Sequence, residues 1–131
     1  MSLPASDLTK EPDMRTTMEL GACLPMTAEV IDDHLYIGGV DMVELAHEYG
    51  TALYVYDEAD LTHRMNTYLE AFRSRYSNSD VAYASKAFLN KAAARLAQEA
   101  GLCLDVSGGG ELAIAQAVGF PMERVIVHGN N

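Results

Sequence analysis

Hydrophobic and polar positions change along the chain in blocks that predict short strands separated by helices. Residues 33–39 (DHLYIGG) and 52–57 (ALYVYD) are short apolar runs bounded by glycine or aspartate, which is typical of strands. Residues 40–50 and 60–76 carry apolar positions at helical spacing. Residues 1–27 are polar, contain three of the four prolines and show no sustained period, so we expect a flexible leader there.

Capping residues give these helices predicted ends. Asp41 and Glu44 have the spacing of an acidic capping box, and Gly50 follows the last periodic position of the first helix. Asp60 precedes the apolar stripe of the second helix and is its expected N-cap.

The second half of the chain repeats the alternation at a regular spacing. Apolar strands are expected to start near residues 81, 102 and 124, about 20 residues apart, with helices over 90–101 and 108–119 between them. From residue 52 onward the predicted order is therefore βαβαβαβ. This order implies parallel strands with right-handed crossovers, and the spacing suits a (β/α) barrel or a doubly wound sheet equally well.

Composition narrows the class of protein. With 131 residues, 49% of them hydrophobic, the chain is long enough for one modest core. Its net charge of −10 argues against a nucleic-acid partner, which needs a basic surface. Two cysteines and four histidines lack the spacing of a metal site, so no metal is expected. No apolar run or signal peptide indicates a membrane partner or export, so we expect a cytoplasmic protein.

A lysine at the end of a predicted buried strand raises the first question of chemistry. In VAYASK, Ala82, Ala84 and Lys86 share one face, which leaves space beside the amine. If Lys86 forms a Schiff base, its amine must lose a proton, and we expect burial to favour that form. The alternative is a surface lysine at a strand end.

Two later strands also end in ionisable side chains. Asp105 and His128 are expected at the carboxyl ends of parallel strands, where active sites of α/β proteins lie. Asp105 alone would cap the next helix, and His128 alone would be a hydrogen-bonded histidine at the rim. The glycines at 108–110 suit either anion binding or close packing between strand and helix, and we favour packing.

Four short motifs give the chain a family resemblance. They are Tyr83–Ala87 (YASKA), Asp105–Val106, Gly109–Leu112 (GGEL) and His128–Asn130 (HGN). In this order and spacing, over about residues 33–131, the chain resembles the N-terminal part of the diaminopimelate decarboxylase family. These are pyridoxal-phosphate enzymes with the alanine-racemase-like fold.

The resemblance implies a fold class and a domain organisation. The chain would be α/β, a partial (β/α)8 TIM barrel of the alanine-racemase-like type. Residues 1–27 would be the leader and residues 28–50 a strand and helix associated with the family's second, β-rich domain. Residues 51–131 would form the first βα units of the barrel. Because a whole barrel takes about 250 residues, we expect this piece to be inactive alone.

The resemblance also implies a chemistry. Lys86 would form an imine with pyridoxal phosphate, Ala84 would leave room for its ring, Asp105 would lie near the imine and His128 would stand at the rim. The reaction would convert the small-molecule substrate meso-2,6-diaminopimelate to L-lysine, in a homodimer. The Tyr-Ala-x-Lys element also occurs in ornithine and arginine decarboxylases. Decarboxylation of another basic amino acid or of a polyamine precursor, and non-catalytic cofactor binding, therefore stay open.

Overall fold

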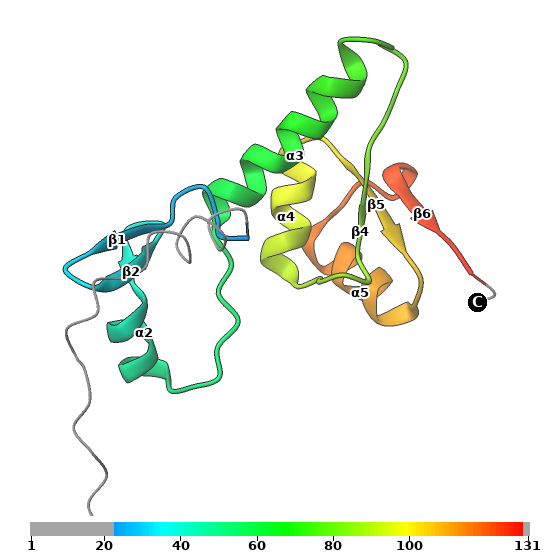
Figure 1. The fold of residues 1–131 in the computed structure, drawn as a ribbon. Coiled ribbons are helices and arrows are strands. Elements are labelled where there is room, and N and C mark those ends of the chain that lie inside the picture. Colours follow the sequence, from blue (N-terminus) through cyan, green and yellow to red (C-terminus); the bar gives the residue numbers. More distant parts are fainter. Residues whose placement is uncertain (1–22, 130–131) are drawn as a thin grey trace, which may run out of the picture. The chain divides into compact units, whose positions relative to one another are not determined.

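The computed structural model describes residues 23–129, which divide into two compact units with the boundary between Asp57 and Glu58. Figure 1 shows the elements of both units along the chain. The predicted leader lies outside the described residues except for residues 23–27, which form turns and a bend. The assignment of residues 28–50 and 51–131 to two domains of a larger protein stays a prediction. Among the described helices, none has the length and apolar content needed to span a membrane.

The first unit begins with a small antiparallel meander. Its strands are β1 (Glu29–Ile31), β2 (His34–Ile37) and β3 (Val40–Asp41), in the order β1-β2-β3. Asp32 and Asp33 connect β1 to β2 with φ angles of 49° and 64°, which suits the two-residue turn of a hairpin. The strand predicted at residues 33–39 is thus present, whereas β1 and β3 were not predicted.

Helix α2 (Met42–Tyr49) follows the meander directly, and its ends are those that the sequence predicts. The Asp41 carboxylate accepts hydrogen bonds from the backbone N–H groups of Val43 at 2.7 Å and Glu44 at 3.3 Å. These bonds satisfy donors that the first helical turn leaves without partners. Gly50 ends the helix at a φ of 82°.

The strand predicted at residues 52–57 is absent, and this prediction was wrong. The segment pairs with no strand among the described residues, and Tyr54 is 92% exposed. Its apolar pattern is real, but a strand also needs a hydrogen-bonded neighbour for its backbone groups. Asp57, at its end, is buried and accepts a hydrogen bond from the Thr27 hydroxyl, which itself accepts from the N–H of Gly38 at 2.8 Å.

The second unit alternates helices and parallel strands. Helix α3 (Glu58–Arg73) begins earlier than predicted, so Asp60 is not the N-cap but lies in the first turn, 2.6 Å from Arg64 Nε. The remaining elements give a sheet of order β4-β5-β6, which lies beside α4 and α5 in Figure 1. These elements are β4 (Ala82–Ala84), α4 (Lys91–Glu99), β5 (Cys103–Val106), α5 (Gly109–Val118), η1 (Met122–Arg124) and β6 (Val125–Val127).

The core of this unit lies on one face of the sheet. Leu104 and Val106 of β5 are fully buried, and the helices α3, α4 and α5 each contribute side chains to the same cluster. The buried members are Met65, Leu69, Ala97, Leu102, Leu104, Val106, Ala115 and Phe120. Because side chains alternate along a strand, the neighbouring positions point to the opposite face. That second face carries the candidate chemistry.

Candidate active site

Strand register places Ala84 and Asp105 on the face of the sheet opposite the core and brings Lys86 and His128 to the same edge. Ala84 pairs with Asp105, and Asp105 pairs with Ile126, so these three positions form one row across β4, β5 and β6. Lys86 and His128 lie two positions beyond Ala84 and Ile126, at the carboxyl ends of their strands. The predicted gathering of site residues at one edge of a parallel sheet is therefore present in the structure.

Asp105 and His128 are in direct contact. Asp105 Oδ1 lies 2.5 Å from His128 Nδ1, and the side chain of Asp105 is 25% exposed. The His128 backbone N–H also donates to the Val106 carbonyl at 3.0 Å, which continues the β5–β6 ladder past the end of β6. Because an ionised carboxylate can only accept, Nδ1 donates, and Nε2 is left for other partners. Asp105 therefore orients the imidazole and does not cap the next helix.

Lys86 is an exposed residue of the turn that directly follows β4. The backbone N–H of the preceding Ser85 donates to the Asp105 carbonyl at 3.0 Å, which ties this turn to β5. The expected burial of the amine is wrong for the described residues, because Lys86 is exposed. No hydrogen bond or ion pair joins it to Asp105 or His128 within residues 23–129. The structure therefore brings two predicted residues into contact and leaves the amine accessible at the same edge of the sheet.

The floor of this face is built from small side chains. Ala82 is exposed and Ala84 half-buried, whereas Val81 and Tyr83 point toward the core cluster. The predicted alternation along β4 is thus confirmed. A hollow of about 220 Å³ runs along the same strand, with an apolar lining that includes Met65 and Tyr68 of α3. Its lining shares Ala82 and Ala84 with the floor of this face but does not include Lys86, Asp105 or His128.

The glycine segment at 108–110 does not pack closely against its surroundings, and the anion that it binds is a side chain of the same chain. A Cβ atom added at any of these three glycines would meet nothing within 4 Å, so the close-packing interpretation is wrong. The amide of Gly108 already binds an anion from the chain itself, because it donates to Glu111 Oε2 at 3.0 Å. Glu111 had no assigned role in the sequence analysis. The spacing from Gly108 to Glu111, that of a capping box, was the available signal.

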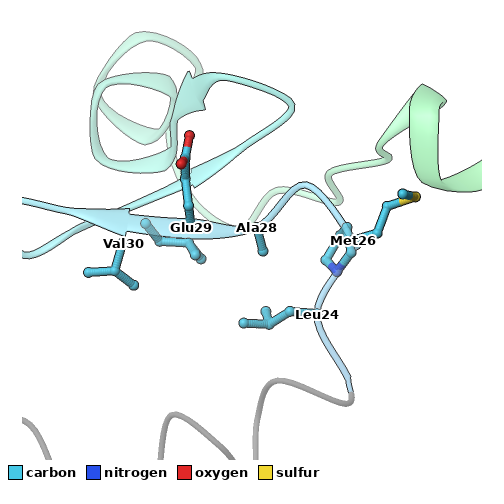
Figure 2. Close-up of a pocket in the computed structure, with 7 residues that line it drawn as sticks. Leu24, Met26, Ala28, Glu29 and Val30 are labelled. Carbon is cyan, nitrogen blue, oxygen red and sulfur yellow. The ribbon is translucent and has the colours of Figure 1, made fainter. Parts of the chain in front are cut away.

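A second hollow lies in the N-terminal unit and does not offer comparable chemistry. It measures about 370 Å³, and its walls are mainly apolar side chains from residues 24–35. In Figure 2 the carboxylate of Glu29 points in the opposite direction from the side chains of Ala28 and Val30, as alternation along β1 requires. No lysine, histidine or cysteine lines it among the described residues. The candidate active site is therefore the carboxyl edge of the β4-β5-β6 sheet.

Comparison with known proteins assigns this arrangement to a family. The family model described as the pyridoxal-binding domain of pyridoxal-dependent decarboxylases matches residues 58–131. The chain belongs to this family. The matched range contains Lys86, Asp105 and His128, together with the whole β4-β5-β6 sheet.

Individual relatives extend the likeness toward the N-terminus. The diaminopimelate decarboxylase of Bacillus subtilis is 55% identical over 98 residues, which cover 75% of this chain and 22% of the relative. That of Mycobacterium tuberculosis is 50% identical over 95 residues, covering 72% of this chain and 21% of the relative. The chain thus spans about a fifth of the length of these curated relatives.

A solved structure supports the fold class. Diaminopimelate decarboxylase from M. jannaschii, in co-complex with L-lysine, matches with a TM-score of 0.69 at 32% identity, over 81% of this chain and 25% of that chain. This likeness and the parallel β4-β5-β6 sheet confirm the predicted α/β class, part of a barrel of the alanine-racemase-like type.

Proposed function

We propose that the chain is part of a decarboxylase that converts meso-2,6-diaminopimelate to L-lysine and CO₂, with pyridoxal phosphate held at Lys86. The observation that carries the proposal is the strand register that pairs Ala84, two residues before Lys86, with Asp105, whose carboxylate contacts His128 at the same edge of the sheet. Both curated relatives described above are diaminopimelate decarboxylases, which supports diaminopimelate as the substrate. We further infer a homodimer in the cytoplasm for the complete protein, in line with the family resemblance.

The residues at this edge fit the cofactor. A primary amine is the group that an aldehyde requires, and Lys86 presents one in an accessible position. Ala82 and Ala84 leave the adjoining surface flat enough for an aromatic ring, since neither carries a side chain beyond Cβ. When bound, pyridoxal phosphate acts as the electron sink that accepts the electron pair left by departing CO₂.

The chain's own polar groups then have defined tasks. Lys86 would hold the cofactor through its side-chain amine, which as a free base could also take up a proton at this edge of the sheet. Asp105 keeps the proton of His128 on Nδ1 and fixes the ring, so Nε2 is directed to other groups on this face. His128 therefore stands at the rim with one nitrogen committed to the protein and one available.

Borohydride reduction tests the cofactor assignment on the chain itself. Pyridoxal phosphate is added, the mixture is reduced, and the modified peptide is identified by mass spectrometry. We expect the label on Lys86 and none on this position in Lys86→Arg. Lys91→Arg is the matched control, because Lys91 is an exposed lysine at the start of α4. Label that persists in Lys86→Arg at the wild-type level would contradict the assignment.

A chimera tests the reaction. Residues of this chain replace the matching segment of the B. subtilis relative, and CO₂ release from meso-2,6-diaminopimelate, ornithine and arginine is measured. We expect release from diaminopimelate, loss of release to background with Lys86→Arg, and no change with Lys91→Arg. Release from ornithine or arginine alone would favour the second substrate class. Label on Lys86 without any release in the chimera would favour a non-catalytic cofactor carrier.

A further inference from the structure

Glu111 makes a concentrated set of contacts at the turn between β5 and α5. Its Oε2 atom accepts hydrogen bonds from the N–H of Ser107 at 2.6 Å, the Ser107 hydroxyl at 3.1 Å and the N–H of Gly108 at 3.0 Å. One carboxylate oxygen thus takes three donors from two consecutive residues. Hydrogen bonds to an ionised acceptor are stronger than neutral ones, so this turn is held firmly from the first turn of α5.

The same turn supports the candidate active site. Ser107 lies two residues after Asp105, and Val106 between them accepts the backbone N–H of His128 at 3.0 Å. A shift of the turn would therefore move both points that locate His128, namely the Val106 carbonyl and the Asp105 carboxylate. The contacts of Glu111 thus act on the Asp105–His128 pair through the backbone.

The charge of Glu111 gives a second connection between this residue and the Asp105–His128 pair. The N–H of Ser107 is the main cause that holds the pKa of Glu111 below its ordinary value, so Glu111 is ionised at neutral pH. The Ser107 hydroxyl, the Gly108 N–H and the charge of His128 act in the same direction, against the opposing effect of desolvation. Glu111 and His128 therefore interact electrostatically, and the imidazole is also in contact with the Asp105 carboxylate.

We infer that Glu111 is a positioning residue of the active site, which fixes the turn after β5 and with it the Asp105–His128 pair beside Lys86. This inference rests on the proposed function for its relevance to the reaction. Its geometric content concerns the chain alone and is tested without cofactor.

Two substitutions separate the hydrogen bonds of Glu111 from its charge. Glu111→Gln keeps an acceptor oxygen for Ser107 and Gly108 but removes the charge, and Glu111→Ala removes both. Glu123→Gln is the matched control, since Glu123 is exposed and lies at the amino end of β6, the other end of the sheet. The measurements are amide hydrogen exchange at Ser107 and Gly108 and the ring ¹⁵N chemical shifts of His128.

We expect Glu111→Ala to speed amide exchange at Ser107 and Gly108 about tenfold, the size expected for losing hydrogen bonds to a charged acceptor. Exchange in the core of β5 should stay unchanged, which shows that the sheet is intact. Both variants should shift the His128 ring signals, and Glu123→Gln should leave them in place. A purely structural helix cap predicts wild-type His128 signals in Glu111→Gln.

The outcomes separate this inference from the proposed function. His128 ring signals at their wild-type positions in both variants would overturn the role of Glu111, whatever the cofactor does. Reduced label on Lys86 in both variants, with shifted ring signals, would support the role in cofactor binding. Shifted ring signals in a chain that never traps pyridoxal phosphate would support the positioning role of Glu111 and count against the decarboxylase.

Discussion

Each unit of the chain contains a histidine paired with an aspartate, and the two pairs look alike in isolation. His34 Nδ1 lies 2.7 Å from Asp41 Oδ2 in the first unit, and His128 Nδ1 lies 2.5 Å from Asp105 Oδ1 in the second. Both pairs join neighbouring strands, β2 with β3 and β5 with the residue after β6. Their histidines are similarly accessible, with side chains 42% and 44% exposed.

The surroundings of the two pairs differ. Asp41 uses its second oxygen to cap α2, and the hydroxyl of Tyr36 also bonds to it, which is the main cause that raises the pKa of Tyr36. The first pair is therefore tied into the joint between the meander and α2. The second pair caps no helix and lies on the face opposite the core, at the sheet edge where the exposed Lys86 follows β4. A His–Asp pair thus indicates function only where its side chains do not already hold elements of the fold together.

The largest expected difference between the pairs is in cofactor binding. Asp105→Asn removes the charged acceptor of His128, so the ring loses its fixed orientation, and we expect the apparent Kd for pyridoxal phosphate to rise about tenfold. Asp41→Asn makes the same chemical change in the other pair and is the control, with an unchanged Kd expected. Absorbance titration followed by borohydride reduction measures both. Equal losses in the two variants would show that the comparison has no functional meaning.

The two pairs should also differ in their contribution to stability, by a smaller amount, and here the first pair should matter more than the second. Asp41→Ala removes the cap of α2 and the partner of His34 together, and we expect the melting temperature of the N-terminal unit to fall by about 5 °C. Asp105→Ala should change the melting of its unit by about 1 °C, since an exposed ion pair contributes little. Amide NMR signals of residues 34–49 and 102–127 follow the two units separately. Similar shifts for both variants would contradict the distinction.

Local signals in the sequence were sufficient for much of the fold. Asp41 and Gly50 bound α2 as predicted, and the Asn90 side chain caps α4 by accepting the N–H of Ala93 at 2.8 Å. The two faces of β4 also follow from alternation alone. These features depend on residues a few positions apart, so the spacing of residues along the sequence is enough to predict them.

Features that depend on a distant partner could not be read in the same way. Residues 52–57 have the composition of a strand, but composition does not say whether another strand lies alongside. Strand β1 has only three residues, and all three are exposed, so it has no burial pattern to detect. For α3, Asp57 and Asp60 are both residues that favour a helix start, and the structure begins the helix at Glu58.

The candidate site was predicted only in part, because some of its features depend on strand order and others on distant partners. Asp105 and His128 each end a strand, and ends of adjacent parallel strands meet at one edge, so their contact follows from topology. The exposure of Lys86 depends on what covers the face, which strand alternation does not describe. The GGEL motif contains Glu111 but does not indicate its role, because a motif names residues without showing which backbone groups they bind.

The smallest expected effect is a pH dependence of the first pair. The hydrogen bond to Asp41, aided by the charges of Asp41, Glu44 and Asp32, raises the pKa of His34 above 6.5. The folded chain therefore binds this proton more tightly than the unfolded chain, and the stabilisation is complete below pH 6.5 and disappears as the pH rises through the raised value. The pKa of Asp41 falls from 3.8 to about 2, with the His34 bond as the main cause, so its contribution is present above 3.8 and is lost as the pH falls toward 2.

The N-terminal unit should accordingly melt highest between about pH 4 and pH 6.5, and by a few degrees less at pH 8. His34→Gln should remove the loss on the alkaline side and keep the loss on the acid side, because Asp41 retains its bonds to Val43 and Glu44. His47→Gln is the control, since His47 is an exposed histidine in the last turn of α2. A melting profile of His34→Gln that still falls between pH 6.5 and 8, as in the wild type, would show that a different group titrates there. The charge on His34 would then not contribute to the stability of the joint that Asp41 makes between the meander and α2.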